Sequence, residues 1–133
     1  MLLTHKIQLV PNNKQTGYFA RAAGVSRFAY NWALAEWQRQ YEAGERPSEI
    51  SLRKQLNGIK REQFPWMYEV AKSAPQQAIK NLGTAFNRFF TKQGGYPRFK
   101  KKGFHDSFRA DNGPTQKGKD AVRVNGKRIK LAK

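Results

Sequence analysis

The sequence predicts an α+β fold in which about four helices lie between one N-terminal strand and a C-terminal hairpin. Three patterns support this prediction. Apolar residues alternate from Leu3 to Val10, they recur at steps of three and four from Ser73 to Phe90, and Asn125-Gly126 interrupts a C-terminal run. The chain has 133 residues, 38% of them hydrophobic, so it is large enough to form one packed core.

The first two predicted helices are separated by a glycine. One runs from Lys14 to about Ala23, Gly24 stops it, and the next runs from Ser26 to Gly44, before the break at Pro47. Two helices joined by such a turn form a helix-turn-helix in the loose sense. A DNA-reading helix is short and polar, whereas this second helix is long and aromatic. The pattern therefore favours packing over insertion into a DNA groove.

The next two predicted helices have clearer limits. Ser51 stands as the cap of the third helix, which ends at Phe64. Ser73 and Gln76 have the spacing of a capping box for the fourth helix, and Pro75 lies in its first turn. We expect one face of the fourth helix to be buried, because apolar residues recur along it at helical spacing: Ile79, Leu82, Phe86 and Phe89.

The C-terminal part predicts short strands. Ser107 to Ala110 is a candidate strand, and the run from Val122 to Leu131 is a candidate hairpin. Asn125-Gly126 suits the two left-handed positions of a type I′ turn, which would place Arg123 opposite Arg128. Two cations directly across a ladder repel each other, so this pair is tolerable in water and useful beneath a phosphate.

The charge balance indicates a polyanionic partner. The chain has 26 Lys and Arg against 9 Asp and Glu, a net charge of +17. The excess is concentrated from Arg88 onward, where fourteen basic residues, Arg88 included, stand against three acidic ones. The chain lacks cysteine, which excludes disulfides and thiolate zinc sites, and no apolar run reaches the ~20 residues of a membrane span. The function classes that remain are led by nucleic-acid binding.

A basic loop from Gly94 to Gly103 is the main candidate for this binding. Its cations can neutralise phosphates, and an aromatic ring, Tyr96 or Phe99, can stack on bases. The alternatives are a solvated linker for the loop and an anchoring role for Phe99. The four cations are Arg98, Lys100, Lys101 and Lys102.

Three further groups complete the candidate site. At the start of the fourth helix, free amides can bind a phosphate and glutamine can read adenine, or the residues simply cap the helix. Asn31 lies one helical turn from Arg27, either as a base reader or as a buried hydrogen-bonding strut. The hairpin adds two cations. The candidates are Arg27 and Asn31; Lys72, Ser73, Gln76, Gln77 and Lys80; Arg123 and Arg128.

Catalysis has little support in the sequence. A two-metal nuclease needs several converging carboxylates, and His5 and His105 lack the spacing of metal ligands. We therefore expect neither a catalytic residue nor a metal or cofactor. An active enzyme that uses Asp106 or Asp111 is the rival hypothesis, and a stand-alone helix-turn-helix repressor is another.

Taken in chain order, the segments described above resemble the N-terminal part of the TnpB (OrfB) proteins of insertion sequences. Proteins of this family are called transposases, and they are RNA-guided DNA endonucleases related to type V CRISPR effectors. The resemblance covers essentially the whole chain. Its motifs are Val10-Pro11, Ser26–Leu34, Gln76-Gln77, Gly95–Lys101, Asp106–Arg109 and Asn125–Ile129.

The resemblance implies three regions. Residues 1–11 would be the first strand of an antiparallel oligonucleotide-binding-type β-barrel, residues 12–93 a helical recognition insert, and residues 94–133 a basic loop with further strands of a barrel that stays incomplete. It also implies guide RNA and target DNA as partners, in a prokaryotic cytoplasm near the nucleoid. Lys72, Ser73 and Gln76 would read a short DNA motif, and the loop and hairpin would hold RNA.

The family's nuclease domain and cysteine zinc ribbon have no counterpart in these residues. We therefore expect a nucleic-acid-binding region that does not cut DNA by itself. A gene remnant without a function of its own is the last alternative, and its exposed barrel edge would then favour association between copies.

Overall fold

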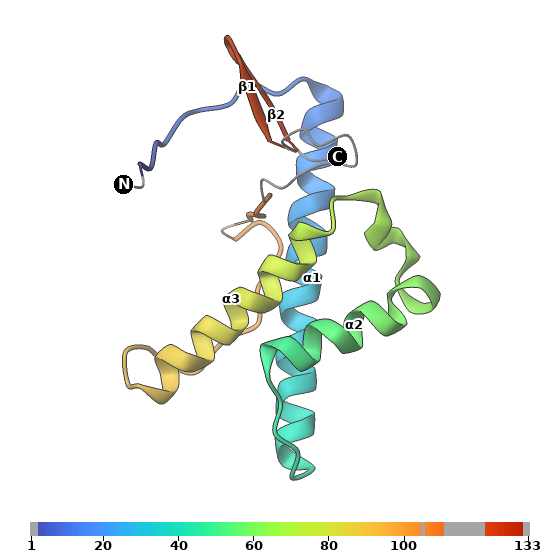
Figure 1. The fold of residues 1–133 in the computed structure, drawn as a ribbon, viewed down its shortest axis with the longest axis vertical. Helices are drawn as coiled ribbons and strands as arrows, with labels where there is room; N and C mark the ends of the chain where they lie inside the picture. Colours follow the sequence, from blue (N-terminus) through green and yellow to red (C-terminus); the bar gives the residue numbers. More distant parts are fainter. Residues whose placement is uncertain (1–2, 105, 111–121, 132–133) are drawn as a thin grey trace.

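A computed structural model describes residues 3–104, 106–110 and 122–131 of the chain. Figure 1 shows one long helix, α1, with α2 and α3 crossing it and a small hairpin near one end. The fold class is α+β, and in the described residues the helices are fewer and the sheet smaller than we expected. The elements are α1 Asn13–Glu42, α2 Glu49–Gln63, the 3₁₀ helix η1 Pro65–Glu69, α3 Ser73–Phe90, β1 Arg123–Asn125 and β2 Arg128–Lys130.

The core forms where α3 crosses α1. Alanines on α1 let the two helices approach closely, and Ala22, Ala29 and Ala33 are fully buried there. The ring of Phe86 on α3 stacks on that of Trp37 on α1, with centroids 4.1 Å apart and an interplanar angle of 13°. The predicted stripe on α3 is confirmed: Ile79, Leu82 and Phe86 are buried and Phe89 is half-buried.

The α1 helix is continuous through Gly24, so the predicted break there is wrong. A glycine inside a helix costs only about 1 kcal/mol relative to alanine, and the buried residues Ala22, Val25 and Ala29 continue one stripe across it. The helix ends where predicted, because Gly44 has a left-handed φ of +84°. The first turn between two α-helices therefore lies at residues 43–48, between α1 and α2, and not at Gly24.

The caps of the later helices also differ from those predicted. Ser48 caps α2, with its Oγ accepting from the Ser51 amide at 3.2 Å, while Ser51 is the third helical residue and its Oγ accepts from the Ser48 amide at 3.3 Å. In α3, Ser73 is already helical and buried, and the cap residue Lys72 makes no side-chain cap bond. Pro75 does lie in the first turn of α3, as predicted.

The predicted N-terminal strand is absent. Residues 3–10 have no regular secondary structure, and Leu3, Ile7 and Leu9 are 72%, 62% and 47% exposed. Residues 107–110 are not a strand either. A strand needs a neighbour to pair its backbone groups, and in the described residues the sheet contains only β1 and β2. The four-helix insert and the barrel are therefore not what these residues form.

The C-terminal hairpin is confirmed, but its turn lies one residue later than predicted, so each β1 residue pairs two positions further along the chain. Asn125 pairs with Arg128, Val124 with Ile129, and Arg123 with Lys130. The two-residue loop is thus Gly126-Lys127, and only Gly126 has a positive φ, +58°, as a type II′ turn requires. Arg123 consequently faces Lys130 instead of Arg128, so two cations still lie across the ladder.

The crossing of α2 and α3 leaves no room for a side chain at Gly83. A Cβ there would lie 2.8 Å from both Cβ and Cγ of Glu49. We expect Gly83→Ala to lower the free energy of unfolding by roughly 1–3 kcal/mol, because the two helices must separate. Urea denaturation measures this change.

Gly58 in α2 is the matched control, since nothing lies within 4 Å of a Cβ added there. Gly58→Ala should raise the free energy of unfolding by about 0.4–1 kcal/mol, because alanine restricts the unfolded chain. Equal changes in the two variants would show that the close approach of α2 and α3 is wrong.

Candidate nucleic-acid interface

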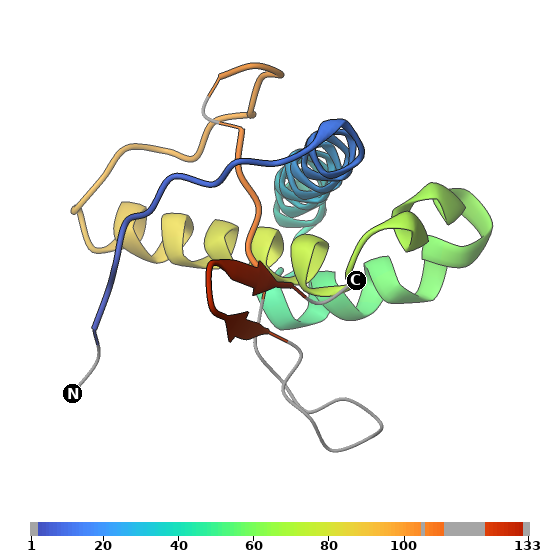
Figure 2. The same ribbon diagram turned by 90° about the horizontal axis from the view of Figure 1, so that it is seen from above.

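The basic loop predicted from the sequence is an irregular strap, residues 95–104, laid against α1 (Figure 2). The side chain of Asn31 on α1 holds the strap by its backbone. Its Nδ2 donates to the Lys100 carbonyl oxygen at 2.9 Å, and its Oδ1 accepts from the Lys100 amide at 2.7 Å. Both ends of the Asn31 amide are therefore engaged, which is the strut role that the sequence left open.

Aromatic contacts anchor the strap to α3. The Tyr96 ring meets Phe86 and Phe89 edge-on, with centroids 5.5 Å and 5.2 Å away, and Pro97 beside it is buried. Phe99 is 52% exposed and Tyr96 is 45% exposed. The sequence offered both rings for stacking and suggested an anchoring role for Phe99. In the structure the ring contacts with α3 are made by Tyr96, so Tyr96 anchors the strap.

A second anchor joins the far end of the strap to α1. Arg27 Nη1 lies 3.0 Å from Asp106 Oδ1, and both carboxylate oxygens of Asp106 accept from the Gly103 amide at 3.1 Å. Gly103 has a φ of +80°, so this turn favours glycine. Because Arg27 and Asp106 neutralise each other, Arg27 stabilises the strap and contributes little net charge to a surface.

The cations of the strap face solvent. Arg98, Lys101 and Lys102 are exposed, while the exposed Lys100 places its Nζ 4.7 Å from the centre of the Tyr30 ring. Residues 95–104 contain no acidic side chain. A free basic loop would leave the positions of its charges undefined, but the clamp at Asn31 and the anchor at Tyr96 hold the backbone that carries these charges.

The start of α3 presents mixed features. Lys72 and Lys80 are exposed, Gln76 and Gln77 are half-buried, and Ser73 is buried. The Gln76 amide already donates to the Lys72 carbonyl at 3.4 Å, and Pro75 has no amide hydrogen. Less backbone is therefore free to bind a phosphate than the sequence suggested, and the side chains of Lys72, Gln76 and Lys80 are the available groups.

Sequence analysis missed a buried lysine near this helix start. Lys60 on α2 is only 6% exposed, and its Nζ lies 4.7 Å from the centre of the Tyr68 ring. Burial, and then repulsion by Lys72, lower the pKa of Lys60. The local sequence around Lys60 is basic and does not predict burial. Lys60 is buried because η1, which carries Tyr68, packs against α2.

The hairpin keeps its cations on the surface. Arg123 and Arg128 are exposed on β1 and β2, and no described contact joins them to the strap. The structure therefore brings together Asn31, Lys100 and Tyr96 with Arg27, while the hairpin arginines and the residues at the start of α3 lie on other elements.

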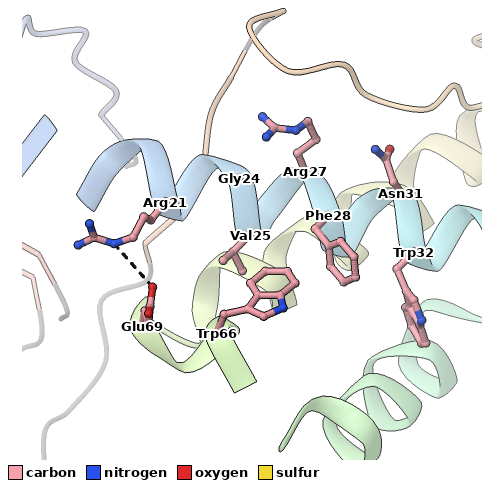
Figure 3. Close-up of a pocket in the computed structure, with 9 residues that line it drawn as sticks. All are labelled: Arg21, Gly24, Val25, Arg27, Phe28, Asn31, Trp32, Trp66 and Glu69. Carbon is pink, nitrogen blue, oxygen red and sulfur yellow. Dashed lines mark ion pairs between the residues drawn. The ribbon is translucent and has the colours of Figure 1, made fainter. Parts of the chain in front are cut away.

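A groove of about 560 Å³ lies on the flank of α1 (Figure 3). Phe28, Trp32 and Trp66 point into one side of it. Its charges are balanced, because Arg21 lies 4.0 Å from Glu69 and Arg27 pairs with Asp106. The groove is thus apolar without the net positive charge of the strap. It is lined by Arg21, Gly24, Val25, Arg27, Phe28, Asn31, Trp32, Trp66 and Glu69.

The geometry disfavours the repressor hypothesis, and it shows that Asp106 of the enzyme hypothesis is engaged in structural contacts. In the proposed recognition helix, Ala29, Ala33 and Leu34 are fully buried and Trp37 stacks on Phe86, so that face packs inside the molecule. Asp106 is held by Arg27 and Gly103, and Asp111 lies outside the described residues.

Two features are absent from the described residues. No group of three or more His, Asp or Glu side chains is placed to hold a metal ion. None of the helices in this part has both the length and the hydropathy to cross a membrane.

These elements define a basic, mainly helical domain of helix-turn-helix type. Residues 1–46 match the helix-turn-helix domain family HTH_OrfB_IS605. The chain is 34% identical over 116 residues to the "Putative RNA-guided DNA endonuclease InsQ" of Escherichia coli (strain K12), covering 84% of this chain and 28% of that protein. It is 33% identical over 99 residues to a "Putative RNA-guided DNA endonuclease" of Streptomyces pristinaespiralis, covering 73% of this chain and 25% of that protein.

These matches confirm the resemblance to the OrfB-type insertion-sequence proteins: the chain carries their helix-turn-helix domain and is similar to RNA-guided endonucleases over most of its own length. It spans 28% and 25% of the length of these two relatives.

The buried Lys60 predicts a pH dependence of stability. Because its folded pKa lies below the 10.5 of the free side chain, the unfolded state binds more protons between these two values. The free energy of unfolding of the parent, relative to that of Lys60→Met, should therefore rise as the pH increases through this window. Chemical denaturation at several alkaline pH values measures the difference.

Lys54→Met is the control, since Lys54 is exposed on the same helix. The Lys60→Met difference should change more steeply with pH than the Lys54→Met difference, because only Lys60 is buried. If Lys60→Met behaves like Lys54→Met, Lys60 is not desolvated in the folded protein.

Proposed function

We propose that this chain binds nucleic acid through the cationic face of the strap, as the DNA-motif and guide-RNA-binding region of an OrfB-type RNA-guided endonuclease. The observation that carries the proposal is that the strap is held against α1 and α3 while its cations stay exposed. Arg98, Lys101 and Lys102 are exposed on a backbone held by Asn31 and Tyr96. Fixed cations gain more from a polyphosphate than mobile ones do, because less side-chain and backbone entropy is lost on binding.

The proposed partners are guide RNA and target DNA. Both similar proteins are named as RNA-guided DNA endonucleases, and in RNA-guided systems base pairing supplies most of the sequence specificity while the protein holds backbones and reads a short flanking motif. A chain with many cations and few exposed base-reading side chains suits this division. In the same proposal, residues 12–93 form the recognition insert, and residues 1–11 and 94–133 are segments that would contribute to a barrel, which the described residues do not form by themselves.

The start of α3 is the proposed motif reader. Gln76 is half-buried, and the exposed Lys72 and Lys80 lie one turn before and one turn after it. The Gln76 amide can donate and accept at an adenine edge while the lysines bind the adjacent phosphates. DNA cleavage is assigned to none of the described residues, since the one described carboxylate near the strap, Asp106, is held by Arg27.

Salt dependence tests the proposal. Fluorescence anisotropy with single-stranded RNA, single-stranded DNA and duplex DNA should show log affinity falling steeply with log salt. Replacing Arg98, Lys101 and Lys102 by Gln should reduce the slope for single strands by about 2, at roughly 0.7 per phosphate contact. Gln76→Ala should keep the slope and change the preference among flanking DNA motifs.

The matched control replaces Lys14, Lys54 and Arg61 by Gln. These residues are exposed on α1 and α2, so the control variant loses the same three positive charges outside the strap. The control should bind nearly as tightly as the parent. Equal losses in the two triple variants would leave only non-specific attraction, and affinity that does not change with salt would refute the proposal.

A further inference from the structure

A second, small pocket lies where α1, α3 and the segment that follows the strap meet. We call it the junction pocket. Its volume is about 100 Å³. Residues from all three segments line it, so it exists only when the strap is in place. The lining residues are Ser26 and Tyr30 of α1; Gln77, Ala78 and Asn81 of α3; and Lys100, Ser107, Phe108 and Arg109.

The lining of the junction pocket is rich in hydrogen-bond donors. Ser26 and Ser107 supply hydroxyl groups, Gln77 and Asn81 supply amide groups, and Lys100 and Arg109 are cations. No carboxylate is among the lining residues. Burial raises the pKa of the Tyr30 phenol, so its hydroxyl stays protonated at neutral pH and remains a donor. A pocket with these groups and the Lys100 ammonium has the chemistry of an anion site.

Lys100 is held at this pocket by two independent contacts. Its backbone is bound on both sides by Asn31, at 2.9 Å and 2.7 Å. Its ammonium group lies 4.7 Å from the centre of the Tyr30 ring, which also lines the pocket. In the part of the chain that the structure describes, no carboxylate forms an ion pair with Lys100. The cation is therefore positioned without being neutralised.

The size of the pocket restricts the anion. A volume of about 100 Å³ equals roughly three water molecules at ~30 Å³ each, which suits a tetrahedral oxyanion. It is well below the roughly 300 Å³ at which pockets for larger organic ligands begin. Asn81, Lys100, Ser107 and Arg109 are exposed residues, so the pocket can be reached from solvent.

We infer that the junction pocket binds one phosphate group of a nucleic-acid backbone. This inference rests on the proposed function and makes it more specific. The exposed strap attracts a polyphosphate without fixing its register, whereas the junction pocket receives a single phosphodiester and sets the position of the strand across α1 and α3. Lys100 and Lys101 are neighbours with equal charge, yet only Lys100 lines the pocket, so the two lysines should differ in their effect on binding.

The test compares Lys100→Gln with Lys101→Gln. In chloride buffer, titration with inorganic phosphate should shift the amide NMR signals of Ser26, Asn81 and Lys100 in a saturable way. The shifts should persist in Lys101→Gln and be lost in Lys100→Gln. For a single-stranded oligonucleotide, Lys100→Gln should weaken binding by about tenfold or more, the loss expected for a hydrogen bond to a charged group. Lys101→Gln should weaken it only a few-fold.

A second pair of variants places a negative charge on α3. Asn81→Asp puts a carboxylate in the pocket, and Asn87→Asp puts one on the same helix outside it; both residues are exposed, so both variants should fold. Asn81→Asp should abolish the phosphate-dependent shifts, and Asn87→Asp should retain them.

A third experiment replaces one phosphate of the oligonucleotide at a time by a neutral methylphosphonate. At one position the replacement should greatly reduce the affinity of the parent and leave the affinity of Lys100→Gln unchanged.

The outcomes separate this inference from the proposed function. Equal losses in Lys100→Gln and Lys101→Gln, with oligonucleotide binding intact in the parent, overturn the junction pocket alone. Shifts with inorganic phosphate and no position-dependent methylphosphonate effect overturn its assignment to a nucleic-acid backbone. If the parent binds no oligonucleotide at low salt, the proposed function fails as well.

Discussion

The candidate interface depends on two hydrogen bonds between the Asn31 side chain and the Lys100 backbone. The strap has no regular secondary structure, so its backbone groups lack the partners that a helix or sheet would give them. Asn31 supplies both a donor and an acceptor at one residue, as a neighbouring strand would. The clamp thereby turns a basic loop into a surface of defined shape, and it places the Lys100 ammonium over Tyr30 at the edge of the junction pocket.

Much of the helical structure follows from local patterns. The stripe through Ile79, Leu82 and Phe86 predicted the buried face of α3, and Gly44 predicted the end of α1. Local rules failed where packing outweighs propensity. The free-energy cost of a glycine in a helix is small. The stabilisation gained by burying the stripe of apolar residues that passes Gly24 in α1 exceeds this cost. The predicted strand at residues 3–10 failed because alternation cannot show whether a pairing strand is present.

The candidate site was predicted in composition but not in arrangement. Charge and aromatic content identified the strap, because these depend on sequence alone. The roles of Asn31 and Tyr96 depend on which residues meet across the fold, and Asn31 and Lys100 lie 69 positions apart. No periodicity reports such a contact. The same holds for the burial of Lys60, which depends on the path of η1 past α2.

Amide hydrogen exchange at Lys100 tests the central claim most directly. The Lys100 amide donates to Asn31, whereas the described residues provide no acceptor for the adjacent Lys101 amide, so one chain contains both the probe and its control. We predict that the Lys100 amide is protected and that the Lys101 amide exchanges at nearly the rate of an unstructured peptide. Equally fast exchange at both amides would contradict the account, because the strap would then be a free basic loop without a defined surface.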